Sequence, residues 1–390
     1  MNGREKVLSC LNFDKGSRSV KAEFAFWYET LDRWYKEGLP KDEGLPEHAI
    51  GHNIRSNFNT NFLNEKMVDN DVSNYFDFDF KSHSILNDFS PMYEKVTLEE
   101  NDEFIIFKDD YGITQKRLKD EQGGIRSSMP MYLDFPIRSR DDFLDYKERI
   151  GNDFEKRMET GWAETAKKFQ SEGQLIMLCG RSNGFFWFPR KTMGLEGFLM
   201  TIYDDPTLLN EILDFISDTT ISFWEYILEK VEVDLVLINE DMAFKGGPLL
   251  SLDSFKELLE PRYRKLTGFL KKYKIENIFV DSDGDMTSLI PLLLNSGVNG
   301  LLPFEVTGTM DLIKIREDYP ELKIAGGVNK MKLFGDKHEI DKELEKIPHM
   351  LKKGGYVPFL DHSVPPLVSW DNFVYYREKL NDIIFQNPIE

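Results

Sequence analysis

The chain has 390 residues, of which 41% are hydrophobic and 30% are charged, and its formal net charge is -19. This composition is typical of a globular protein with a large core, and such an acidic chain is poorly suited to bind nucleic acid or an anionic membrane. Because Cys10 and Cys179 are the only cysteines, neither a disulfide framework nor a cysteine-rich metal site is expected.

The N-terminal residues 1–6 are polar and lack the apolar core of a signal peptide. No apolar run approaches the roughly 20 residues that a membrane-spanning helix needs. We therefore expect a cytoplasmic protein that does not insert into a membrane.

The N-terminal third mixes predicted helices and strands. Residues 3–12 are expected to form a helix, residues 20–27 a strand and residues 30–37 a second helix, which ends at Gly38. Between about 60 and 150, short alternating runs joined by polar turns predict a β-hairpin insertion on the main body.

From residue 151 onward, predicted helices and strands alternate regularly, which is typical of βα units and a parallel sheet. With the strand at 20–27, these units fit a (β/α)₈ barrel. No Gly-x-Gly-x-x-Gly turn supports a dinucleotide-binding fold. We expect a single domain, residues 1–390. The predicted strands are 174–179, 234–238, 277–280, 300–304, 323–327 and 356–360, and the predicted helices are 153–171, 206–231, 252–273, 286–294, 310–318, 340–353 and 370–384.

Ionisable residues follow the predicted strands, as expected where the carboxyl-terminal rim of a parallel barrel is an active site. Asp281 and Asp283 stand one residue apart, and like charges this close raise each other's pKa unless a cation or strong donors lie between them. The other residues of this kind are Glu240, Asp241, Glu305, Asp361 and His362.

Several segments resemble the uroporphyrinogen decarboxylase superfamily, which includes corrinoid-dependent methyltransferases. They are the opening segment 3–12 and the segments 238–248, 280–284, 303–306, 325–328 and 354–366. The resemblance covers most of the chain and implies a distorted (β/α)₈ TIM barrel.

Two departures separate the branches of this superfamily. Its porphyrinogen decarboxylases carry an early Arg-Gln-Ala-Gly-Arg segment, whereas residues 26–31 here are aromatic and acidic, with no arginine until Arg33. Such a mouth is electrostatically poor for a substrate with many carboxylates. Where thiol-methylating members bind zinc through His-x-Cys and a later Cys, this chain has Asp281-x-Asp283 and His362. Oxygen and imidazole ligands suit a metal that polarises an oxygen.

The resemblance therefore implies a methyltransferase component of the O-demethylase type. A zinc ion held by Asp281, Asp283 and His362 would help move a methyl group from a methoxy compound to cob(I)alamin. Because the chain has no Asp-x-His-x-x-Gly segment, the cobalamin would be carried by a separate corrinoid protein. Manganese or iron would accept these ligands too, and members of the superfamily often form dimers.

Other rim residues are assigned supporting roles. A flat aryl substrate would suit aromatic side chains near the strand ends, and an arginine could hold a carboxylate or phenolate. The predicted catalytic residues are Glu240, Asp241 and Glu305, and the predicted substrate-binding residues are Trp27, Tyr28, Arg181, Phe186 and Trp187.

Structural interpretations remain open beside these roles. Asp283 could cap a helix at 286, Asp241 could bind the next loop, and His362 could pair with Asp361. Glu305 could pair with a buried lysine such as Lys245. The alternative functions are a metal-free decarboxylase of porphyrin metabolism, with rim carboxylates as general acids, and a non-catalytic binding protein.

Overall fold

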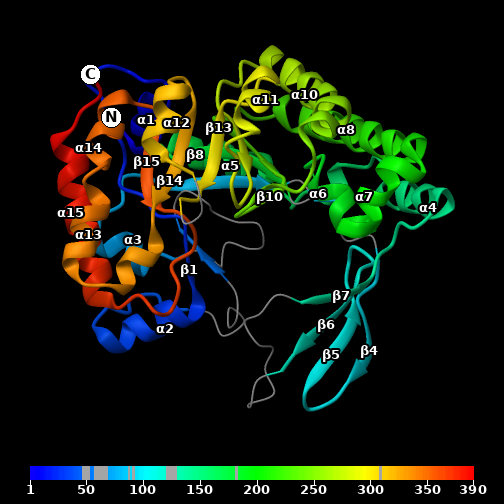
Figure 1. The fold of residues 1–390 in the computed structure, drawn as a ribbon, viewed down its shortest axis with the longest axis horizontal. Helices are drawn as coiled ribbons and strands as arrows, with labels where there is room; N and C mark the ends of the chain where they lie inside the picture. Colours follow the sequence, from blue (N-terminus) through cyan, green and yellow to red (C-terminus); the bar gives the residue numbers. More distant parts are fainter. Residues whose placement is uncertain are drawn as a thin grey trace.

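A computed structural model describes residues 1–45, 53–56, 69–86, 88–89, 93–119, 130–180, 183–306 and 310–390. Its centre is a curved parallel sheet with the strand order β15-β14-β13-β12-β9-β8-β3 (Figure 1). The strands from β8 to β15 in this order are buried along nearly their whole length, as expected for a parallel sheet covered by helices. The bounds of the strands in this sheet are β3 (Ser82–Leu86), β8 (Leu175–Gly180), β9 (Leu235–Asn239), β12 (Ile278–Asp281), β13 (Gly300–Phe304), β14 (Lys323–Val328) and β15 (Tyr356–Leu360).

The N-terminal segment fills the space between the two edges of this sheet. Strand β1 (Ala25–Trp27) forms a parallel bridge to Val364 beyond β15. Four residues before β1, the carbonyl of Lys21 accepts the N–H of Asp79, ahead of β3. Together with the seven-stranded sheet, this segment gives the distorted (β/α)₈ barrel that the sequence predicts.

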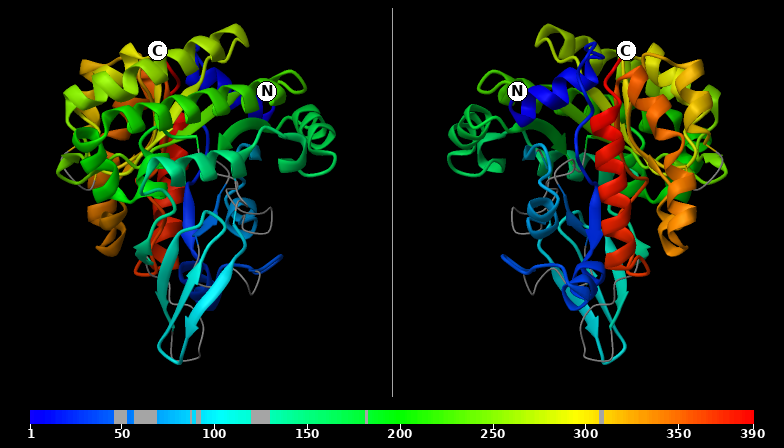
Figure 2. Two further views of the ribbon diagram at one scale, coloured as in Figure 1. Left: turned by 90° about the vertical axis from the view of Figure 1, so that its right-hand side faces the viewer. Right: turned by 90° about the vertical axis from the view of Figure 1, so that its left-hand side faces the viewer.

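Helices cover the outside of the sheet (Figures 1 and 2). The longest of them begins where Asp205 accepts the N–H of Leu208, with a proline in its first turn. The helices are α1 (Gly3–Leu11), α2 (Tyr28–Glu37), α3 (Asp71–Tyr75), α4 (Arg140–Ile150), α5 (Trp162–Ser171), α6 (Trp187–Met193), α7 (Leu195–Asp204), α8 (Pro206–Leu228), α9 (Leu252–Ser254), α10 (Glu260–Lys272), α11 (Ile290–Asn295), α12 (Leu312–Asp318), α13 (Lys337–Leu344), α14 (Ile347–Lys353) and α15 (Trp370–Gln386). In the described part of the chain, none of them is long and apolar enough to cross a bilayer.

The predicted helix 153–171 is divided in the structure. A 3₁₀ turn, η3 (Glu155–Arg157), precedes α5, and Gly161 between them has a φ of +78°. That left-handed conformation interrupts a right-handed helix. The predicted helix 252–273 is instead nearly continuous, because a π-helical stretch, η4 (Phe255–Leu259), joins α9 to α10.

The insertion differs from the predicted hairpin. Four antiparallel strands form a sheet that projects from the barrel, on the side away from both termini (Figures 1 and 2). We call these four strands the arm. Strand β3, which also lies between 60 and 150, belongs to the barrel. The strands of the arm are β4 (Val96–Glu100), β5 (Phe104–Lys108), β6 (Thr114–Leu118) and β7 (Met131–Asp134).

The remaining short elements lie around the barrel mouth. Strand β2 (Asn53–Arg55) pairs antiparallel with β1, and β10 (Ala243–Phe244) forms a small hairpin with β11 (Gly247–Pro248). A 3₁₀ helix, η5 (Lys330–Phe334), begins two residues after β14.

Candidate metal centre at the carboxyl ends of the strands

The predicted rim residues lie where four strands of the parallel sheet end. Asp241 follows β9, Asp281 is the last residue of β12, and Glu305 follows β13 directly. His362 stands two residues beyond β15. Because parallel strands end on one side of the sheet, these side chains share the mouth of the barrel.

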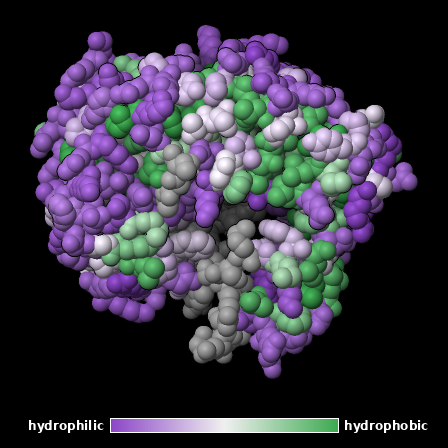
Figure 3. Space-filling model, in the orientation of Figure 1, coloured by the Kyte–Doolittle hydropathy of each residue, from purple (hydrophilic) through white to green (hydrophobic). Residues whose placement is uncertain are grey.

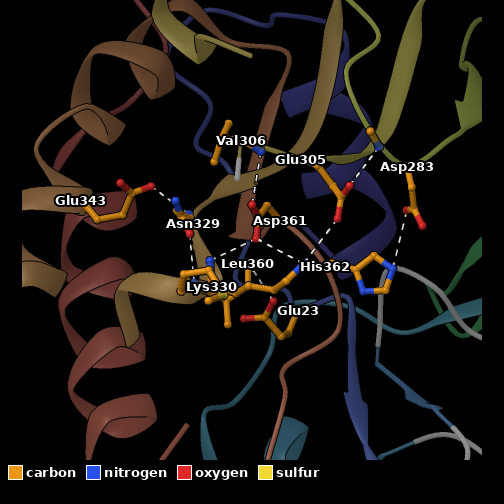
Figure 4. A network of polar contacts seen from close by, with 12 residues as sticks. Glu23, Asp283, Glu305, Val306, Asn329, Lys330, Glu343, Leu360, Asp361 and His362 are labelled. Atoms are coloured by element: carbon orange, nitrogen blue, oxygen red, sulfur yellow. Dashed lines mark hydrogen bonds and ion pairs between the residues drawn. The ribbon is translucent and has the colours of Figure 1, made fainter. Parts of the chain in front are cut away.

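Three of these residues form a group that can hold a metal ion (Figure 4). Asp283, Glu305 and His362 each offer one ligand atom, and the three atoms lie within 4.8 Å of one another. The Nε2 atom of His362 is 3.6 Å from a carboxylate oxygen of Asp283. Two carboxylates and one imidazole match the three protein ligands of a catalytic zinc site, which keeps its fourth position open. The donor set therefore fits zinc.

This group differs from the predicted set by one residue. Asp283 and His362 are both in it, but the third member within the described residues is Glu305, which we had predicted as a catalytic residue. Asp281 as a ligand remains a prediction. Asp283 is not the suggested N-cap, because α11 begins at Ile290 and its N-cap residue is Leu289.

The Glu305 carboxylate is held from two sides. One oxygen accepts the N–H of Gly284 at 2.9 Å, and the other lies 3.3 Å from the Nζ atom of Lys330. The suggested partner Lys245 is exposed instead. These two donors fix the plane of the carboxylate beside Asp283.

His362 and its neighbour Asp361 each have their own contacts. Asp361 is fully buried and accepts the backbone N–H groups of Val306 at 3.2 Å and Lys330 at 3.0 Å. The imidazole of His362 packs against the Phe24 ring, with 5.7 Å between ring centroids, and faces Asp283. Its position is therefore compatible with metal binding.

Three aspartates share the mouth, and their pKa values diverge. Burial, followed by the charges of Asp283 and Asp241, raises the pKa of Asp281 well above its usual value. The pKa of Asp241 is also raised, first by burial and then by Asp283. Burial acts in the same direction on Asp283, but the adjacent His362 outweighs it and lowers that pKa. Asp283 is therefore the carboxylate best suited to hold a cation.

Asp241 lies directly beside Asp283. Its carboxylate accepts the backbone N–H of Asp283 and lies 3.2 Å from a guanidinium nitrogen of Arg190. The same nitrogen donates to the backbone carbonyl of Asp241 at 2.6 Å. Asp241 has a φ of +53°, which is uncommon for a residue with a side chain. Arg190 thus holds an uncommon turn at the edge of the candidate site.

Glu240 is fully buried and bound at the start of α6. It accepts the backbone N–H groups of Phe185 at 2.8 Å, Phe186 at 2.7 Å and Trp187 at 3.1 Å, and the hydroxyl of Tyr263. Burial raises its pKa to about 7, although these donors favour the charged form. The structure shows Glu240 anchoring a helix; its predicted catalytic role remains a prediction.

The predicted substrate-binding residues are divided between the mouth and the core. Trp27 ends β1, Tyr28 begins α2, and both are half-buried. Trp187 is half-buried and lies 5.6 Å from the Arg190 guanidinium. Phe186 is fully buried and packs edge-on against Phe198. Arg181 lies outside the described residues.

Sequence reasoning missed two cations of this mouth. Lys330 follows β14 by two residues, so the strand-end argument applied to the other rim residues could have identified it. Arg55 ends the short strand β2, 5.7 Å from the Phe24 ring, and its charge helps to lower the pKa of Asp283. No sequence pattern marks Arg55.

The chain is similar in sequence to a known protein family. The sequence profile of the uroporphyrinogen decarboxylase family matches residues 136–381, more than half of the chain. No protein of curated function matches it. A methyltransferase from Methanosarcina mazei is similar in structure, with a TM-score of 0.46 and 16% identity over 66% of this chain and 74% of that one. An E. coli 3-keto-D-glucoside 4-epimerase gives a TM-score of 0.33 and 12% identity over 64% and 95%.

Proposed function

Because the chain belongs to the uroporphyrinogen decarboxylase family, we propose that it is a methyltransferase component that binds one zinc ion through Asp283, Glu305 and His362. The observation that carries this proposal is the convergence of their ligand atoms within 4.8 Å at the barrel mouth. The methyl donor would be a methoxy compound, and the acceptor would be cob(I)alamin on a separate corrinoid protein.

The reaction class follows from the donor set. The methyl carbon would pass from the donor oxygen to cob(I)alamin on the partner, and the electron pair of the broken carbon–oxygen bond would stay on the departing oxygen. A zinc ion held here would supply Lewis-acid stabilisation of that oxygen. Oxygen and nitrogen ligands suit this task better than thiolates do, because thiolates favour soft partners.

The protein's own residues would orient the donor and manage its proton. Trp27, Tyr28 and Trp187 border the mouth and would contact an aryl ring. Burial and the neighbouring carboxylates raise the pKa of Asp281, so Asp281 would be the carboxyl group that delivers a proton to the departing oxygen. Arg190 would keep Asp241 in place beside Asp283.

The corrinoid protein would dock over the mouth, beside the arm. Apolar side chains gather on the arm (Figure 3), and exposed apolar area of this kind marks an interaction surface. The large apolar residues exposed on the arm are Val96, Leu98, Leu118, Met131, Tyr132 and Leu133.

The test combines metal analysis with methyl transfer. We expect about one zinc per wild-type chain, and a loss of both zinc and methyl transfer to cob(I)alamin in Asp283→Ala and His362→Ala. The controls are Asp253→Ala and His338→Ala, because both residues are exposed and neither belongs to the proposed ligand set. Wild-type protein without stoichiometric zinc, even after zinc is added, would contradict the proposal.

A metal-free decarboxylase is the second candidate, and one observation favours it. The raised pKa of Asp281 favours its protonated form, which is the kind of general acid that such a reaction uses. Turnover of a porphyrinogen by chelator-treated protein, with loss of turnover in Asp281→Asn, would establish this function in place of methyl transfer.

A further inference from the structure

A lysine and a buried aspartate lie directly behind the candidate metal ligand Glu305 (Figure 4). The Nζ atom of Lys330 is 3.3 Å from Glu305 Oε1 and 3.9 Å from Asp361 Oδ1. The Lys330 side chain is only 18% exposed, and that of Asp361 is 0% exposed. The ammonium group is thus enclosed between two carboxylates, one of which is a proposed ligand.

The backbone fixes this arrangement independently of the ammonium group. Asp361 accepts the N–H of Lys330 itself at 3.0 Å, so the start of η5 is tied to the end of β15. Glu305 also retains the N–H of Gly284 on its other oxygen at 2.9 Å. Removing the ammonium group alone should therefore leave Glu305 and Asp361 near their present positions.

An ammonium group in this position competes with a bound cation. It partly compensates the negative charge of Glu305, and it would repel a divalent ion bound by the same carboxylate a few ångströms away. The repulsion is weakly screened, because Lys330 and Asp361 are shielded from solvent. Groups that contact a metal ligand in this way tune the metal from outside its coordination sphere.

We propose that Lys330 is a positioning residue that acts through Glu305 to weaken zinc binding and preserve the positive charge of the site for the substrate oxygen. This inference rests on the proposed zinc site. It predicts that losing Lys330 strengthens zinc binding, whereas a purely structural support would weaken binding when removed.

The test measures the zinc dissociation constant of the purified full chain by competition with a chromophoric chelator. In Lys330→Met we expect the constant to fall at least tenfold, and in Lys330→Arg to stay within threefold of wild type, because the positive charge remains. Lys330→Gln is a second neutral variant should the methionine variant fail to fold. Lys332→Met is the matched control, because Lys332 lies on η5 too but pairs with Glu339 at 2.7 Å.

The outcomes separate this inference from the proposed function. An unchanged or increased constant in both neutral variants, with zinc still lost in Asp283→Ala, would overturn the role of Lys330 and leave the zinc site intact. Wild-type protein that binds zinc no better than Asp283→Ala would remove the site, and the role of Lys330 with it.

Discussion

Gly284 offers a sharp test of how the candidate site is built. It follows Asp283, has a φ of +85°, and donates its N–H to Glu305. A Cβ atom there would lie 2.6 Å from the backbone of Phe244 in the β10–β11 hairpin. Ordinary contact begins near 3.4 Å, so Gly284→Ala requires a shift of 3.4 − 2.6 = 0.8 Å. Metal sites tolerate roughly 0.2 Å in ligand distances, so we expect zinc to be lost.

The cost in stability has two parts. A left-handed conformation costs a residue with a side chain roughly 1–2 kcal/mol, and overpacking costs a further 1–3 kcal/mol or so. We therefore expect Gly284→Ala to lower the free energy of unfolding by about 2–5 kcal/mol. Gly161→Ala isolates the first part, because Gly161 has a φ of +78° and a Cβ there would meet nothing within 4 Å.

Urea denaturation and zinc analysis of both variants decide the matter. We expect Gly161→Ala to keep its full zinc content and to lose about 1–2 kcal/mol of the free energy of unfolding. Gly284→Ala should lose more of this free energy and should contain no zinc. Full zinc in Gly284→Ala, with the same stability as Gly161→Ala, would refute the reasoning. It would show that the β10–β11 hairpin gives way while the turn holding Asp283 stays in place.

Three further predictions concern buried carboxyls and the arm. Glu23 is fully buried beside Arg377, and burial raises its pKa from 4.5 to about 7. The folded state then binds this proton more tightly than the unfolded state does. As pH rises from 4.5 to 7, the free energy of unfolding of the wild type, measured by urea denaturation, should therefore fall by about 3 kcal/mol relative to that of Glu23→Gln. Glu240→Ala leaves the N–H groups at the start of α6 unpaired and should lower the free energy of unfolding by about 3–5 kcal/mol, whereas Glu257→Ala, at an exposed position, should change it little. If the proposed corrinoid partner docks beside the arm, Leu98→Asp should weaken its binding at least tenfold in calorimetry while zinc content stays as in wild type, and Met200→Asp on α7 serves as its control.

The barrel could be predicted from the sequence because its strands are short apolar runs separated by helices of regular spacing. Each run from β8 to β15 is buried on both faces, so apolarity alone marks it. The four-stranded arm could not be predicted in full, because its strands β4 and β7 are exposed along their whole length. An exposed strand carries little hydrophobic alternation, and only its hydrogen-bonded neighbours establish it.

The sequence predicts where the candidate site lies, but not which of its side chains contact one another. Asp283, Glu305 and His362 follow the ends of predicted parallel strands, and such strands all end on one side of a sheet. The sequence therefore placed these three residues on one rim. Which side chains meet depends on rotamers and on contacts distant in sequence, such as the bond from Gly284 to Glu305. The assignment of Asp281 as a ligand came from the family resemblance, in which Asp281-x-Asp283 stands where a His-x-Cys pair binds zinc, and it remains a prediction.

The charges of the rim explain why one divalent ion suits this mouth. Asp241 is paired with Arg190, Asp361 is compensated by Lys330 and two backbone N–H groups, and the raised pKa of Asp281 disfavours its charged form. Asp283 and Glu305 then contribute two negative charges beside the imidazole of His362. A divalent cation would neutralise both. Because Lys330 also touches Glu305, it would reduce the attraction of this pair for the cation, which is why its removal should strengthen zinc binding.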